Sequence, residues 1–255
     1  MEHGRGAGAV LIQVVAETGS TNADLAASSG GEGDWLRAER QLAGRGRQGR
    51  AWASPVGNLY ASTIVRPRVS DPAAPTLTLV AAVALHDAVS VMFDPASPFL
   101  RAGEQPEERQ GGLAIKWPND LLLNGAKLSG ILLERAGDVV IAGFGVNVAH
   151  HPDLPDRPTT SLAAHGVAVA PATLLDILAE SFARWLATWR GHGLEPVRAA
   201  WLDRAHPVGT ALCVHQPDGS RVDGLFDGLD DAGALLLRLA GGERQVIHAA
   251  DVFLL

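Results

Sequence analysis

The hydrophobic positions of this chain fall into two patterns, which predict strands and helices in alternation. Short continuous apolar runs predict buried strands, and apolar residues that recur every three or four positions predict helices. The strands predicted in the first part of the chain are Val10–Ala16, Trp35–Arg40, Asn58–Val65, Leu113–Lys116 and Val139–Val148. The predicted helices are 22–29, Pro75–Val91, Pro171–Trp189 and Leu194–Arg204.

Two further segments have distinct signals of their own. Leu121–Leu123 and Lys127–Glu134 flank Asn124-Gly125, the strongest two-residue turn signal, and together predict a β-hairpin. The polar segment Asp94–Gly112 contains charges, proline and glycine. It predicts a surface insertion, to which the sequence assigns no role.

The pattern changes after Val208. Short predicted strands there alternate with turn signals at Asp218-Gly219, Asp230-Asp231, Gly233 and Gly241-Gly242. This pattern predicts a small β-barrel. We therefore expect two domains, 1–206 and 207–255, with a boundary near His206-Pro207, and we expect Trp201 to pack the last helix against the barrel.

Composition predicts a globular protein of the cytoplasm. Hydrophobic residues make up 47% of the chain and charged residues 19%, which is too apolar for a disordered protein. The longest apolar runs, such as Leu77–Leu85, are shorter than a membrane span, and no long apolar stretch of a signal peptide follows Met1–Arg5. The single cysteine, Cys213, excludes an internal disulfide and suits a reducing compartment.

The distribution of charge is more specific than its total. A net charge of −7 argues against a nucleic-acid coat protein, which normally has a basic face. Of the 21 basic residues, only Lys116 and Lys127 are lysines. Because the chain uses arginine almost everywhere else, we expect that arginine cannot easily replace these two lysines. The segment 116–147 is therefore a candidate for the functional site.

A glycine- and arginine-rich loop is the first candidate for chemistry. It reads Gly44-Arg45-Gly46-Arg47-Gln48-Gly49-Arg50. Glycines let the backbone approach a ligand closely, and arginines offer forked donors to phosphate or carboxylate. Alone, the loop is equally compatible with a flexible basic loop or a nucleic-acid patch. It is not a Walker A loop, because no Gly-Lys-Ser/Thr ends it.

Two later motifs strengthen that candidate. Lys116-Trp117-Pro118-Asn119-Asp120 precedes the hairpin that carries Lys127, so two lysines and a carboxylate can face one cleft. The glycines of Gly143-Phe144-Gly145-Val146-Asn147 would weaken a strand, and they indicate either close approach of a ligand or a β-bulge. The nine histidines include no helical pair with a carboxylate between them, so we predict no protein-held metal site.

These motifs, in this order and approximate spacing, resemble the biotin–protein ligase family. The resemblance is strong over 20–148, and the segment from Val208 is similar to the family's C-terminal domain. It implies an α+β fold, with a class II aminoacyl-tRNA-synthetase-like mixed sheet, flanking helices and an SH3-like C-terminal barrel. Regulatory members begin with a winged helix-turn-helix. Because the first strand starts near Val10, we expect the short form without that domain, and no DNA partner.

The resemblance also implies roles for individual residues. The polar ureido end of biotin would be bound by Ser20, Thr21, Asn22 and Gln41. Its carboxylate side and the adenylate phosphate would be covered by Arg45, Gly46, Arg47 and Lys127. Trp52 would stack near adenine, and the nucleotide would also be held by Asn119 and Asn147. The same motifs contribute further ligand-binding residues, namely Gly44, Arg50, Lys116 and Gly130.

The expected chemistry fits those residues. Biotin's carboxylate attacks an α-phosphate that is also negative, so cations must offset the repulsion. Arg47, Lys116, Lys127 and a Mg²⁺ ion held mainly by ATP phosphates are suited to this. A lysine of a biotin carboxyl carrier protein then attacks the adenylate, with Asp120 to orient the amine or accept its proton. The catalytic candidates are therefore Lys127, Arg47, Asp120 and Lys116, in a monomer or homodimer.

Three alternatives remain open from sequence. A lipoate–protein ligase would share the general architecture, although the motifs resemble the biotin branch. A nucleic-acid-binding regulator could use the arginine loop, against which the acidic charge counts. A non-catalytic biotin-binding module is disfavoured by the two lysines beside the loop.

Overall fold

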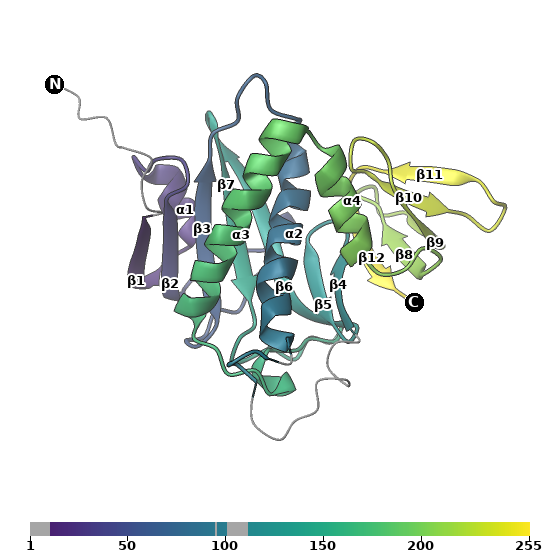
Figure 1. Cartoon of the computed structure of the whole chain (residues 1–255). Coiled ribbons are helices and arrows are strands. Elements are labelled where there is room, and N and C mark those ends of the chain that lie inside the picture. Colours follow the sequence, from purple (N-terminus) through teal and green to yellow (C-terminus); the bar gives the residue numbers. More distant parts are fainter. Residues whose placement is uncertain (1–10, 95, 101–111) are drawn as a thin grey trace.

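A computed structural model describes residues 11–94, 96–100 and 112–255. The segment Met1–Arg5 and most of the predicted insertion Asp94–Gly112 lie outside these residues. A seven-stranded sheet forms the centre of the molecule (Figure 1). Its strands are β1 (Ile12–Thr18), β2 (Trp35–Gln41), β3 (Leu59–Val65), β4 (Leu113–Lys116), β5 (Asp120–Leu123), β6 (Ala126–Ala136) and β7 (Val139–Val146).

The sheet is mixed, as the family resemblance implies. Its strand order is β1-β2-β3-β7-β6-β5-β4, with β1 and β2 parallel and the other neighbours antiparallel. The predicted hairpin joins β5 to β6. Its turn residues Asn124 and Gly125 have φ of 51° and 78°, the left-handed conformations that a tight two-residue hairpin turn requires.

Helices cover the sheet unequally. They are α1 (Thr21–Ala27), α2 (Leu77–Ser90), α3 (Pro171–His192) and α4 (Glu195–Arg204), with 3-10 turns at Arg47–Gly49, Ala74–Thr76, Val91–Phe93 and Ala163–His165. The side chains of β7 alternate between the two faces of the sheet. Ala142, Phe144 and Val146 belong to the large core shared with α2 and α3, whereas Ile141 packs with Leu25 of α1. One face is therefore closed by long helices, and α1 covers only part of the other.

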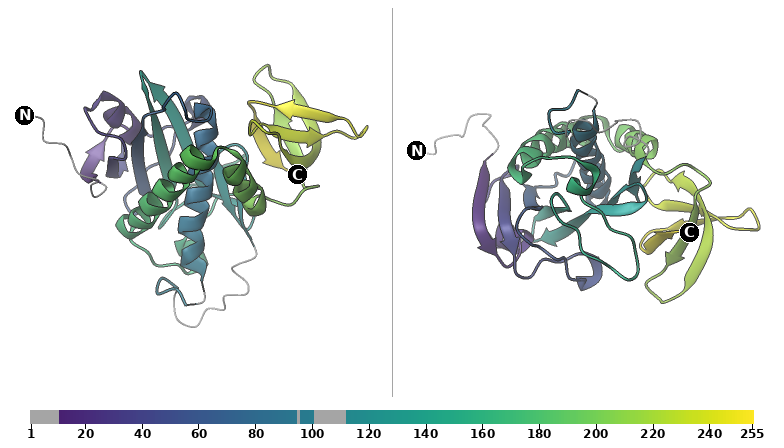
Figure 2. Two further views of the ribbon diagram at one scale, coloured as in Figure 1. Left: turned by 45° about the horizontal axis from the view of Figure 1, so that its top comes forward. Right: turned by 90° about the horizontal axis from the view of Figure 1, so that it is seen from below.

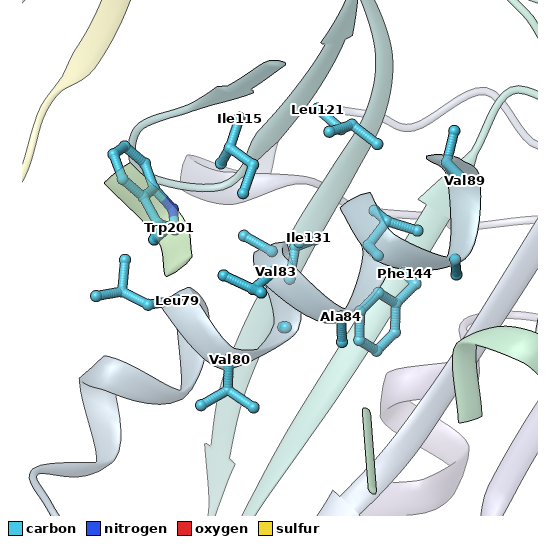
Figure 3. Packing of buried hydrophobic residues seen from close by; sticks show 14 of the residues in the cluster. Leu79, Val80, Val83, Ala84, Val89, Ile115, Leu121, Ile131, Phe144 and Trp201 are labelled. Carbon is cyan, nitrogen blue, oxygen red and sulfur yellow. The ribbon is translucent and has the colours of Figure 1, made fainter. Parts of the chain in front are cut away.

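The core lies between the sheet and α2 to α4 (Figure 3). Phe144 contacts Trp35 and Phe182, with ring centres 5.6 and 5.9 Å apart. The helical stretch Ala74–Phe93 is long and apolar enough to cross a membrane by length and composition alone, but 72% of its apolar 18-residue window is buried inside the protein. Its apolar composition therefore fits its place as the central core helix, and one such helix is weak support for a membrane span.

A second sheet packs against the end of the first that is farthest from β1 (Figures 1 and 2). Its order is β11-β10-β9-β8-β12, all antiparallel. The strands are β8 (Ala211–His215), β9 (Arg221–Leu229), β10 (Leu235–Arg238), β11 (Arg244–Ile247) and β12 (Asp251–Leu254). The ring centres of Trp201 in α4 and Phe226 in β9 lie 6.3 Å apart. This contact confirms the prediction that Trp201 packs the last helix against the C-terminal strands. The predicted boundary near His206-Pro207 falls between α4 and β8.

Candidate active site

A cavity of about 690 Å³ lies on the sheet face that the long helices leave open. Its walls come from the β1–α1 turn, the glycine- and arginine-rich loop, strands β5 to β7, the loop 152–159 and strand β12. Every residue that the sequence predicts for the site lines this cavity except Thr21. The structure thus brings together motifs that are far apart in the chain.

One end of the cavity is built from neutral polar groups. Gln41 Oε1 accepts hydrogen bonds from Thr21 N at 2.9 Å and Thr21 Oγ1 at 3.1 Å. The Thr21 hydroxyl also lies 2.7 Å from Ser62 Oγ, and Ser62 donates to Asn22 Oδ1 at 2.6 Å. Thr21 is buried behind the wall, so it orients Gln41 rather than facing the cavity itself. Direct contact between Thr21 and a ligand stays a prediction.

Further bonds fix the side chains of this end. Asn22 Nδ2 donates to Glu134 Oε2 at 2.7 Å, and Gln41 Nε2 donates to Ser54 Oγ at 3.3 Å. Because buried polar groups are costly when unpaired, this network holds each amide in one orientation. A ligand entering here meets a prearranged set of neutral donors and acceptors.

The other end contains a buried carboxylate between two ammonium groups. Asp120 Oδ1 lies 2.6 Å from Lys127 Nζ, and Asp120 Oδ2 lies 3.0 Å from Lys116 Nζ. Register sets this arrangement, because Lys116 of β4 is opposite Asp120 of β5. The lysines that the composition singles out therefore meet at one carboxylate.

The environment of Asp120 decides its protonation. Burial alone would raise the pKa of Asp120, but the charges of Lys127 and Lys116 outweigh burial and lower the pKa to about 2. For Lys127, burial lowers the pKa despite the attraction of Asp120. A carboxylate with so low a pKa is a poor proton acceptor near neutral pH. The geometry of Asp120 suits holding the two lysines, and its use as a proton acceptor stays a prediction.

Strand β12 of the second sheet and the residue before it, Ala250, close this charged end. Arg47 Nη1 donates to the Ala250 carbonyl at 3.2 Å, and Lys116 Nζ donates to the Val252 carbonyl at 2.7 Å. Arg50 forms an ion pair with Asp251. Burial lowers the pKa of Arg47, a cost that the nearby charges of Asp251 and Asp120 partly offset. The second sheet therefore supplies one wall of the site.

Trp52 occupies the middle of the cavity wall. Its ring lies 5.6 Å from Lys127 Nζ and rests on Gly130 of β6 and Gly145 of β7, which are cross-strand partners. The pairing of β6 with β7 runs without a register shift from Ser129 to Ala136. The β-bulge interpretation of the strand glycines is therefore wrong.

The two predicted nucleotide-binding asparagines hold backbone. Asn119 Nδ2 donates to the Ile131 carbonyl at 2.5 Å, and Asn147 Nδ2 donates to the Thr160 carbonyl at 2.9 Å. Their amide nitrogens thus fix the cavity wall. Contact between these side chains and a nucleotide stays a prediction.

Sequence reasoning missed several lining residues. Arg157 pairs with Asp156 in the proline-rich loop, and its guanidinium lies 5.4 Å from the ring centre of Phe253. Asp251 and Val252 reach the cavity from β12. Because nearly all basic residues of this chain are arginines, an arginine by itself does not indicate a functional position. A predicted turn and strand near residue 250 likewise does not indicate that the strand contacts residues 47, 50 and 116. No local signal could have identified these contacts.

Comparison with known proteins agrees with this geometry. Residues 13–149 match the Biotin/lipoate A/B protein ligase family, and residues 214–255 match the biotin protein ligase C terminal domain. The chain is 42% identical to a biotin–[acetyl-CoA-carboxylase] ligase of Paracoccus denitrificans, covering 94% of this chain and 99% of that one. A ligase of the same name from Mycobacterium tuberculosis is 38% identical, with 98% and 91% covered.

A solved structure shows the same fold at lower identity. Biotin protein ligase from Aquifex aeolicus, in complex with biotin and ATP, superposes with a TM-score of 0.80 at 22% identity. The superposition covers 96% of this chain and 99% of that one. Together with the sequence matches, it leads to one conclusion. The chain belongs to the Biotin/lipoate A/B protein ligase family.

Proposed function

We propose that this chain is a biotin–protein ligase. It joins biotin to ATP, releasing pyrophosphate and forming biotinyl-5′-AMP, and then transfers biotin to a lysine of a biotin carboxyl carrier protein. The observation that carries the proposal is one cavity with a neutral hydrogen-bonding end and a cationic end, organised around Asp120. The named relatives are biotin ligases, which favours biotin over lipoate as the acyl substrate.

The neutral end suits the ureido group of biotin. That group is uncharged and carries both donors and an acceptor, so its recognition requires fixed partners of both kinds. The side chains of Ser20, Asn22 and Gln41 line this end, and Thr21 holds Gln41 from behind. A ligand that lacks these polar groups would displace water from this end without offering hydrogen bonds in return, and this supports selectivity for biotin.

The cationic end suits the reacting anions. In the first step a carboxylate oxygen of biotin bonds to the α-phosphorus of ATP, and the bond to pyrophosphate breaks. Lys127, Lys116 and Arg47 line the cavity where these groups would meet. Two unit charges about 4 Å apart interact by roughly 4 kcal/mol at an effective dielectric near 20. Cations at this end therefore reduce the repulsion between the two anions.

Magnesium is proposed to enter with the nucleotide. The carboxylates that line the cavity, Asp120, Asp156 and Asp251, are each paired with a lysine or arginine. Among the described residues no group of three His, Cys, Asp or Glu could hold a metal ion. This lining fits Mg²⁺ bound by the phosphates of ATP, as part of the substrate. The ion would supply further positive charge at the phosphates.

In the second step the carrier's lysine amine bonds to the biotinyl carbonyl carbon, the bond to AMP breaks, and the proton of the amine passes to solvent. We propose that Asp120 contributes by holding Lys116 and Lys127 in place. The proposed setting is the cytoplasm, where the carrier is the protein partner and no DNA partner is required. The buried single cysteine, Cys213, is compatible with that setting.

The deciding experiment supplies the whole protein with biotin, ATP, Mg²⁺ and a purified biotin carboxyl carrier protein. Pyrophosphate release reports the first step, and mass spectrometry of the carrier reports the second. We expect modification of one carrier lysine with biotin and none with lipoate under the same conditions. Pyrophosphate release with lipoate but not biotin would replace this proposal with the lipoate alternative.

A further inference from the structure

Strand β7 presents two glycines to the cavity. Gly143 and Gly145 alternate with Ala142, Phe144 and Val146, which pack into the core on the opposite face of the sheet. Neither glycine has a positive φ, so the backbone there accepts any residue. Glycine weakens a strand, so some other factor must favour it in a central one. That factor is the space above each glycine.

The space above Gly143 is filled by Asn22. A Cβ atom at Gly143 would lie 2.2 Å from Asn22 Oδ1 and 2.9 Å from its Cγ. Asn22 cannot easily move away, because Ser62 donates to its Oδ1 at 2.6 Å and its Nδ2 donates to Glu134. Alanine at 143 would therefore push the amide out of its hydrogen bonds.

The space above Gly145 is filled by Trp52. A Cβ atom at Gly145 would lie 2.6 Å from Cε2 and 2.7 Å from Nε1 of the indole. Gly130, the cross-strand partner of Gly145, also makes room for the indole. A Cβ atom at Gly130 would lie 3.1 Å from Cζ3 of Trp52. The indole N–H is buried and has no hydrogen-bond partner among the described residues. Contact with the glycines, rather than a polar bond, therefore fixes the ring.

We propose that Gly143 and Gly145 are positioning residues for different substrates of the proposed ligase. Gly143 sets biotin affinity by leaving room for Asn22, and Gly145 sets nucleotide affinity by leaving room for Trp52. Positions two residues apart on a strand are separated by roughly 6 to 7 Å along its axis. Each glycine therefore acts on a different side chain of the cavity wall. This inference rests on the proposed function, which gives Asn22 to biotin and Trp52 to the nucleotide.

The test compares Gly143→Ala and Gly145→Ala in the full-length protein. Calorimetry measures the Kd of biotin, and pyrophosphate release at saturating biotin measures the KM of ATP. We expect Gly143→Ala to weaken biotin about tenfold or more with the ATP KM within about threefold, and Gly145→Ala to do the reverse. Gly191→Ala is the matched control, because a Cβ there meets nothing within 4 Å and its φ is not positive.

Double variants separate this role from general damage. If Gly145 acts through the indole, adding Gly145→Ala to Trp52→Ala should change the ATP KM by less than about twofold. If Gly143 acts through the amide, adding Gly143→Ala to Asn22→Ala should likewise leave the biotin Kd unchanged. This second pair also serves if Gly143→Ala alone fails to fold, since removing the amide makes room for the methyl group.

Different outcomes would refute the glycine roles and the proposed function of the protein. Parallel loss of both ligands in both single variants, or full additivity in the double variants, would overturn the glycine roles while wild-type adenylation still stands. A wild-type protein that releases no pyrophosphate with biotin and ATP would instead refute the proposed function.

Discussion

The two ends of the cavity lie on the same sheet and are held together in opposite ways. At the neutral end, Thr21, Gln41 and Ser62 link through hydrogen bonds between uncharged groups. At the charged end, Asp120 pairs with both Lys116 and Lys127, and the segment 250–252 adds carbonyl and carboxylate partners for the cations. The neutral end depends on the orientation of its hydrogen-bonding side chains, and the charged end depends on the pairing of opposite charges.

The difference predicts how each end responds to change. A neutral hydrogen bond contributes about 0.5–1.5 kcal/mol, so losing one is tolerable. A buried ion cluster costs more to break than it contributes, because removing one member leaves an unpaired buried charge. Substitutions at the charged end should therefore have larger effects, and effects that depend on pH. The predictions below test this contrast, from the largest expected effect to the smallest.

Asp120→Ala should have the largest effect. It leaves Lys116 and Lys127 without their shared carboxylate in a buried site, and breaking such a cluster costs about 3–5 kcal/mol of unfolding free energy. Urea denaturation measures the loss. Adding Lys116→Met should recover part of it, because one unpaired charge is then removed. Unchanged stability in Asp120→Ala would mean that water compensates the lysines and that the cluster is not closed.

Acid should destabilise the protein through the same carboxylate. Asp120 has a folded-state pKa of about 2, below the ordinary 3.8, so its stabilising contribution is present above pH 4 and is lost as the pH falls towards 2. At about 1.4 kcal/mol per pKa unit the loss is about 2 kcal/mol. Unfolding free energies of the wild type and Asp120→Asn, measured from pH 5 to 2, should converge in acid. Thr21→Val should retain the full acid dependence.

Lys127→Arg should slow adenylate formation while leaving the fold intact. A compact ammonium fits between Asp120 and an anionic substrate, whereas the planar guanidinium keeps the charge but not the fit. We expect a loss of at least about tenfold, or about 1.4 kcal/mol, and a larger loss in Lys127→Ala. Single-turnover pyrophosphate release measures the rate of adenylate formation, and circular dichroism checks that the fold is intact. Arg184→Lys, at an exposed position of α3, is the control. A wild-type rate in Lys127→Arg would leave only a requirement for positive charge.

Thr21→Val should have the smallest effect and should not depend on salt. Valine preserves the shape but removes the hydroxyl that contacts Gln41 and Ser62, at a cost of about 1 kcal/mol. Biotin affinity should fall about five- to tenfold by the same free energy. Calorimetry at low and high salt should give the same loss. A marked salt dependence would show that charge controls this end too.

Local signals predicted much of this architecture. Asn124-Gly125 identified the hairpin because only a few residues adopt left-handed turn geometry without strain. The scarcity of lysine correctly singled out Lys116 and Lys127 as a pair, and the motif order gave the family. These features depend on neighbours in sequence or on residue choice, both of which one chain reveals.

The rest depends on contacts between distant segments. Three charged residues in two motifs do not reveal that both lysines point at Asp120, so the lowered pKa of Asp120 could not be foreseen. Thr21 was placed among the ligand-binding residues by the family resemblance of Ser20-Thr21-Asn22. Only the start of α1 shows that its hydroxyl turns inward.

The packing of Trp201 has a consequence for how this protein can evolve. The hydrophobic cluster that contains it continues from the first sheet into the second, joining Leu79 and Ile115 to Phe226 and Leu235. The second sheet is therefore an integral part of the hydrophobic core, and evolution could not readily remove or replace it. Losing it would leave a tryptophan in water and remove a wall from the cavity. Mutational change should accumulate in its exposed turns, while the residues that face Trp201 vary together with the helix that carries it.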